Sequence, residues 1–162
     1  MALNKISATI FTRPADTTAY AAGDLIANST TAGSVVPLSF RLPTSGKNAT
    51  VQGIVVQKSA TSLTNFSTTL HLFDASPTVA GGDNAAPAPS AAGYLGSIST
   101  ATTSALAGTG VAWATNSSDV STKPTFVVPA SRTVYGLLTA TGAYTPASEE
   151  TFTVSIVVDI NK

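Results

Sequence analysis

The chain has 162 residues, of which 43% are hydrophobic and only 10% are charged, and its formal net charge is +0. This length suits one domain with a single core, residues 1–162. A neutral chain has no long-range field that would attract nucleic-acid phosphates or anionic lipids, so neither nucleic acid nor a membrane is an expected partner. Cysteine is absent, which excludes disulfides and thiolate ligands. No apolar run of signal-peptide length follows Met1, so we expect the protein to stay in the cytoplasm where it is made.

Short segments in which every second side chain is apolar predict β-strands along the whole chain. In chain order, the predicted strands are residues 6–10, 25–26, 38–42, 49–58, 66–72, 94–98, 111–114, 126–128, 134–138 and 152–160. Residues 49–58 are apolar on both faces, which is typical of a central strand, and Gly53 indicates a bulge there. Residues 1–5 precede the first predicted strand, and we expect them to form an N-terminal arm.

Two segments show no alternation and are predicted to be irregular. Ser76–Ala92 is rich in Pro, Gly and Ala, and Thr100–Gly110 is rich in Thr, Ala and Ser, with at most one helical turn at Thr102–Ala107. Antiparallel strands must each bury one face, so the pattern predicts an all-β, two-sheet antiparallel sandwich with long loops. We favour a jelly roll, although a closed barrel and an immunoglobulin-like sandwich fit the same pattern.

Catalytic residues are not expected. His71 is followed by Asp74 and Ser76, residue types that form hydrolytic triads, but His71 and Asp74 would point to opposite faces of a strand. Glu149 and Glu150 are the only glutamates, and adjacent strand residues cannot flank one glycosidic bond. We therefore interpret the two glutamates as charged residues that protect the final strand from aggregation, and we expect no enzymatic activity.

Metal and cofactor sites are not expected either. Gly81–Asn84 carries one carboxylate, far fewer than the six to eight oxygen ligands that Ca²⁺ requires, so a plain turn is predicted. The chain has no Gly-rich phosphate loop and no spaced histidines. Trp113 is predicted to be a partly buried core residue, and a platform for a sugar ring or a protein partner is the alternative.

Two stretches are the most distinctive in the chain: FTRPADTTAYAAGDLIANS (Phe11–Ser29) and YTPASEETFTVSIVVDI (Tyr144–Ile160). They resemble segments of the virion structural proteins of tailed bacteriophages. Their residues also have a local interpretation, because Pro14 ends the opening strand and Gly23 permits a turn. Arg13 is expected to pair with Asp16 across this corner, as an exposed ion pair worth about 0 to 1 kcal/mol.

Within that family, the size, the low charge and the sandwich pattern look most like a capsid decoration (cement) protein. The resemblance implies a jelly roll on the capsid surface of the virion, commonly a trimer, with the major capsid protein as partner. On this hypothesis residues 1–11 and the loop Ser76–Ala92 reach across capsomer boundaries. The candidate partner-binding residues are Leu3, Asn4, Lys5, Ile6, Arg13 and Trp113.

Two alternatives share the predicted fold. One is a tail, fibre or host-recognition module, and the other is a carbohydrate-binding β-sandwich. Either would need a shallow aromatic site, for which Trp113, Tyr94 and Tyr144 are the candidates.

Overall fold

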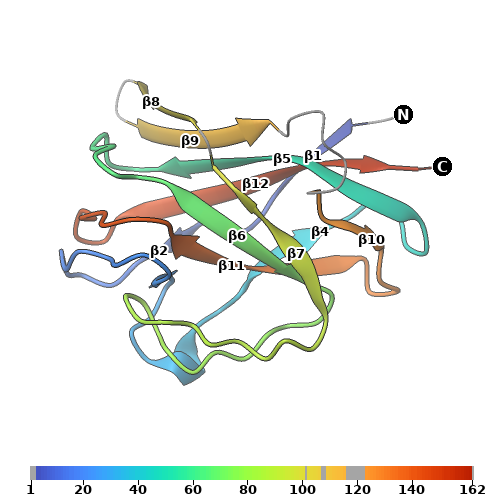
Figure 1. The fold of residues 1–162 in the computed structure, drawn as a ribbon, viewed down its shortest axis with the longest axis horizontal. Helices are drawn as coiled ribbons and strands as arrows, with labels where there is room; N and C mark the ends of the chain where they lie inside the picture. The colour runs from blue at the N-terminus through green and yellow to red at the C-terminus, as the bar shows by residue number, and fades with distance from the viewer. Residues whose placement is uncertain (1–2, 101, 107–108, 116–122, 162) are drawn as a thin grey trace.

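The computed structural model of the chain describes residues 3–100, 102–106, 109–115 and 123–161, and these residues form almost only β-strands (Figure 1). One short 3-10 helix, η1, spans Ala32–Ser34. The strands are β1 (Leu3–Ser7), β2 (Phe11–Thr12), β3 (Leu25–Ile26), β4 (Leu38–Arg41), β5 (Asn48–Lys58), β6 (Thr68–Phe73), β7 (Tyr94–Ser99), β8 (Thr102–Leu106), β9 (Thr109–Thr115), β10 (Thr125–Val127), β11 (Thr133–Ala140) and β12 (Thr151–Ile160). The predicted all-β fold is confirmed.

The strands form two antiparallel sheets that pack face to face. The seven-stranded sheet has the order β1-β12-β5-β9-β8, with β2 beside β12 and β10 beside β5. The five-stranded sheet has the order β3-β11-β6-β7, with β4 beside β11. When β1, β4, β5, β6, β7, β9, β11 and β12 are numbered one to eight, the sheets have the orders 1-8-3-6 and 2-7-4-5. This is the strand order of a jelly roll, so the predicted two-sheet sandwich is confirmed together with the favoured topology.

The core lies between the two sheets, because alternation places one face of every strand inside. On β12, the side chains of Phe152, Val154, Ile156 and Val158 are fully buried. β5 lies between β12 and β9, as expected for the segment that is apolar on both faces. The pairing register shifts at Gln52, which leaves one extra residue on β5 beside Gly53, so the predicted bulge is confirmed.

A second, smaller apolar cluster lies on the outer face of the five-stranded sheet. Its buried members are Leu25, Ala27, Phe73 and Leu137. Val35, which follows η1, and Val79, in the loop between β6 and β7, pack against these residues. In Figure 1 this loop runs along the lower edge of the molecule, below β6 and β11. Ser76–Ala92 is therefore the irregular segment that the sequence predicts. The side chain of Val79 packs this loop against the sheet.

Residues 3–12 form one edge of the seven-stranded sheet. β1 and β2 both pair with β12 and follow each other along it. Ala8 donates its backbone N–H to the Val154 carbonyl at 2.9 Å, and Phe11 pairs with Phe152. The three residue steps from Ala8 to Phe11 therefore lie opposite only two steps on β12, from Val154 to Phe152. The extra residue forms a β-bulge at residues 9–10.

The structure differs here from the predicted arm at residues 1–5 and the predicted strand at residues 6–10. Residues 3–5 belong to β1, because they pair with the end of β12, and residues 1–2 lie outside the described part of the chain. The strand then breaks at the bulge, where the sequence predicted that it would continue.

A second difference concerns Thr100–Gly110, which the sequence predicted to be irregular. Residues 102–106 form β8, which pairs with β9 from Thr102↔Trp113 to Leu106↔Thr109. The predicted helical turn at residues 102–107 is therefore wrong for the residues that are described, and Ala107 lies outside them. Strand structure in such a weakly alternating segment comes from pairing with a neighbour, which a local sequence window does not contain.

Candidate functional site

The structure separates the six predicted partner-binding residues into an edge, a face and an interior position. Residues 3–6 lie on the edge strand β1. Trp113 lies on β9, three strands away in the same sheet, and it pairs with Val55. Trp113 is half-buried but faces away from the core, because Val55 alternates with the core residues Ile54 and Val56. The prediction of a core tryptophan is therefore wrong.

Arg13 lies inside the protein, where it forms an ion pair with Asp83. Its Nη2 lies 3.0 Å from Asp83 Oδ2, and both side chains are fully buried. Its Nε donates a hydrogen bond to the Tyr20 hydroxyl at 2.9 Å. The predicted pair with Asp16 also forms, at 3.1 Å, and only the Asp16 side chain is partly exposed, at 36%. The Arg13 side chain therefore makes its contacts inside the protein, and its assignment to the partner-binding surface is corrected.

Asp83 holds the long loop against the first third of the chain. Its carboxylate accepts hydrogen bonds from the Tyr20 hydroxyl at 2.7 Å and from the Ala27 backbone N–H at 2.8 Å, in addition to Arg13. The turn that the sequence predicts at Gly81–Asn84 thus carries a buried, fully engaged carboxylate. No local pattern signals this role, because Asp83 is 70 residues from Arg13.

Lys58 and Glu150 form a second buried ion pair. Lys58 Nζ donates to Glu150 Oε1 at 2.7 Å, and neither side chain is exposed. The Tyr144 hydroxyl donates to the other oxygen of Glu150. Lys58 Nζ also lies 5.1 Å from the ring centres of Phe66 and Tyr144, within the range of a cation–π contact. The prediction that Glu150 protects the surface of the final strand is therefore wrong, whereas Glu149 is exposed.

The two ion pairs are joined into one buried network by stacked tyrosine rings. The ring centres of Tyr20 and Tyr144 lie 5.9 Å apart with an angle of 6° between the planes. The Tyr20 backbone N–H donates to the Tyr144 carbonyl at 2.9 Å, and the Arg13 N–H donates to the Glu150 carbonyl at 3.0 Å. The stretches Phe11–Ser29 and Tyr144–Ile160 thus lie against each other, and the residues that join them stabilise the fold.

Tyr20 and Tyr144 are shifted strongly toward their neutral forms. Burial raises the pKa of Tyr20, and the hydrogen bond that it donates to Asp83 raises it further. Burial and the hydrogen bond to Glu150 raise the pKa of Tyr144 in the same way. Tyr144 is 1% exposed, so it is removed from the candidates for a shallow aromatic site.

His71 lies on the outer face of the five-stranded sheet, and within the described residues the hydrogen-bonding partners of its ring are hydroxyl groups and not carboxylates. Its ring nitrogens lie 3.3 Å from the Tyr94 hydroxyl and 3.3 Å from Thr139 Oγ1. Asp74 and Ser76 are exposed, and neither is bonded to the ring. Burial lowers the pKa of His71, so the ring is neutral at pH 7.

Within the part of the chain that the structure describes, no group of three or more His, Asp or Glu side chains is placed to hold a metal ion. Among the helices of the same part of the chain, none has the length and apolar composition to cross a membrane.

An uncharged groove opens on the side of the sandwich, between an edge of the seven-stranded sheet and an edge of the five-stranded sheet. Its volume is about 340 Å³. It lies between the bulged edge, residues 9–12, and residues 36–39, which lead into β4. We call this groove the open flank. Ile10 and Val36 on its walls are 63% and 71% exposed. Asn28 completes the lining and fixes one wall, because its Oδ1 accepts the Val36 N–H at 2.8 Å.

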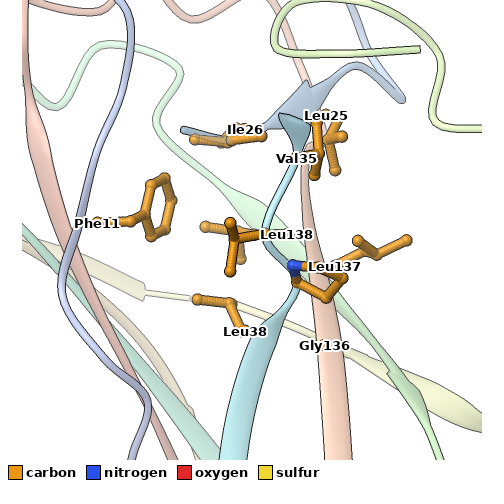
Figure 2. A pocket seen from close by; sticks show the side chains of 11 residues that line it. Phe11, Leu25, Ile26, Val35, Leu38, Gly136, Leu137 and Leu138 are labelled. Carbon is orange, nitrogen blue, oxygen red and sulfur yellow. The ribbon is translucent and has the colours of Figure 1, made fainter. Parts of the chain in front are cut away.

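A small apolar cavity of about 10 Å³ lies next to the open flank and shares four of its lining residues. Figure 2 shows Phe11 facing Leu38 and Leu138 across it. A space of this size holds at most one water molecule, and apolar walls give that water no hydrogen-bond partner. The cavity is therefore a packing gap, and the groove outside it is the accessible feature.

Comparison with known proteins does not assign the chain. No protein-family model matches it, and no curated protein is significantly similar to it in sequence.

We expect Asp83→Asn to lower the free energy of unfolding by about 3 to 5 kcal/mol, because it leaves the buried Arg13 charge without its main partner. Urea unfolding followed by circular dichroism measures the change. The matched control is Asp16→Asn, which removes the partly exposed partner of the same arginine and should cost at most about 1 kcal/mol. Equal losses in the two variants would contradict the central place of the Arg13–Asp83 pair.

The raised tyrosine pKa values predict a loss of stability in alkali. Above pH of about 10, the ordinary pKa of tyrosine, the unfolded chain releases protons that folded Tyr20 and Tyr144 retain. The free energy of unfolding should therefore fall as pH rises, by up to about 1.4 kcal/mol per pH unit for each tyrosine. Tyr20→Phe should make this slope shallower in urea unfolding measured from pH 9 upward. Identical slopes in the wild type and the variant would be the contrary result.

Proposed function

We propose that this chain is a non-enzymatic virion structural protein that binds the outer surface of a tailed-bacteriophage capsid and stabilises the assembled shell. In this proposal the partner is the major capsid protein, and the chain acts as a homo-oligomer, with a trimer favoured. It is made in the host cytoplasm and ends on the capsid surface of the virion. The resemblance of Phe11–Ser29 and Tyr144–Ile160 to phage virion proteins supports this role, as do the neutral charge and the jelly-roll topology.

The open flank is the observation that carries the proposal. Two large apolar side chains, Ile10 and Val36, face solvent across a groove lined by uncharged residues. Exposed apolar surface rimmed by polar residues is typical of protein–protein interfaces. Leu3, at the start of β1 on the same edge of the sheet, is a further exposed apolar side chain, at 66%. Residues 3–6 thus keep their predicted place at the partner surface in this proposal.

Such a surface stabilises a shell by selective binding. A protein that binds the assembled capsid, and not its free subunits, shifts the equilibrium toward the shell by mass action. At a free concentration one hundred times Kd, each occupied site contributes about 2.7 kcal/mol. Because the groove is uncharged, this contribution should depend little on salt concentration.

The double variant Ile10→Asp, Val36→Asp should weaken capsid binding at least about tenfold, since the interface would then bury two unpaired carboxylates. Co-sedimentation with capsids stripped of this protein measures the affinity. The control is Val127→Asp, because Val127 is 60% exposed on β10, which lies across the sheet from β1. Both variants should retain the wild-type circular dichroism spectrum.

Unchanged capsid affinity in the double variant, with a folded protein, would overturn the assignment of the open flank. The number of copies per particle tests the role itself. Many copies, removable without loss of the shell, are expected for a decoration protein, whereas a few copies confined to the tail would exclude that role.

A further inference from the structure

A shallow hollow lies on the outer face of the seven-stranded sheet, where β12, β5 and β9 run side by side. Its volume is about 320 Å³. The hollow is lined by Gln57, Lys58, Ser59, Thr109, Thr151 and Thr153. It shares no lining residue with the open flank, and it plays no part in the function proposed above.

The strand register explains why these polar side chains meet. Val56 and Phe152 point into the core, so Gln57 and Thr153, their neighbours in sequence, point outward. Gln57 pairs with Thr153 on one side and with Val111 on the other. Hydroxyl and amide groups from three adjacent strands are thereby brought onto one patch of the surface.

The hollow is electrically neutral, although a lysine lies in its wall. Lys58 points inward, and its Nζ is bound to Glu150 Oε1 at 2.7 Å with both side chains fully buried. The polar groups left for a ligand are the Gln57 amide and the threonine hydroxyls, which both donate and accept hydrogen bonds. Among the described residues, no side chain bonds to the Gln57 amide or to the Thr109 and Thr153 hydroxyls.

Trp113 adds an aromatic surface next to these groups. It lies on the same outward face as Gln57, two residues beyond the Val111 that pairs with Gln57. Such diagonal neighbours are about 7 to 8 Å apart, within reach of a large side chain. Trp113 is half-buried, so part of its side chain is open to solvent, whereas Val111 beside it is only 8% exposed.

We propose that Trp113 and this hollow form a binding site for a neutral carbohydrate. The apolar face of a sugar ring stacks on the indole, and its hydroxyls exchange hydrogen bonds with the Gln57 amide and the hydroxyls of Thr109 and Thr153. A neutral, hydroxyl-rich ligand matches a hollow whose lining offers no free charge, whereas an anionic or cationic ligand would find no counter-charge in that lining. The site and the open flank consist of different residues, so sugar binding and capsid binding can be tested independently.

The test is a titration of the whole protein with neutral hexasaccharides of glucose, mannose and N-acetylglucosamine, followed by the fluorescence of Trp113, the single tryptophan of the chain. We expect a saturable change with at least one of them at up to millimolar concentration, and none with an acidic hexasaccharide of galacturonic acid. Isothermal titration calorimetry on the same ligand gives Kd for the variants.

Trp113→Ala should abolish the heat of binding, and Gln57→Ala should raise Kd about threefold to tenfold, as expected for the loss of one or two hydrogen bonds. The matched control is Tyr94→Ala, since Tyr94 is an exposed aromatic residue on the other sheet and should leave Kd unchanged. The proposal would be overturned if none of the three neutral sugars bound saturably. It would also be overturned by binding that survives Trp113→Ala, or by binding of the acidic sugar alone.

Discussion

The buried ion pairs Arg13–Asp83 and Lys58–Glu150, joined by the stacked rings of Tyr20 and Tyr144, are the constraint on which the rest of the structure depends. Four charges are removed from water, and this is tolerable only because their oxygens and N–H groups find partners nearby. The network connects four segments that are distant in sequence. Loss of one charged residue would leave its partner unpaired in the interior. The four segments must therefore take up their positions together.

Both proposed surfaces are built directly on this network. Arg13 follows β2, so its anchorage fixes residues 9–12, which form one wall of the open flank. Lys58 ends β5 and forms part of the hollow beside Gln57, where its pairing with Glu150 removes the only charge. The interior electrostatics thus determine two exterior properties: where the bulged edge lies, and why the hollow carries no free charge.

The fold could be predicted from the sequence because strand alternation is a local property. Residues 152–160 show their buried face in a window of ten residues, and they form a strand with that face inside. Residues 49–58, apolar on both faces, form a strand in the interior of its sheet. The ion pairs could not be predicted, because their members are 70 and 92 residues apart and a sequence shows residue types without showing which of them meet. The same limit applies to β8, whose strand structure depends on β9, and to Trp113, whose outward direction follows from its register with Val55.

The bulge at residues 9–10 has a consequence for the behaviour of the free protein. A long, straight outer strand with unpaired N–H and C=O groups is a template on which further chains add, and it would drive copies of a neutral protein into fibres. Here the outer strand is divided into pieces of five and two residues, separated by a kink. The kink interrupts the row of unpaired N–H and C=O groups along which a further strand could pair. The free protein can therefore keep the apolar side chains of Ile10 and Val36 exposed beside this edge without offering further copies a continuous strand to pair with.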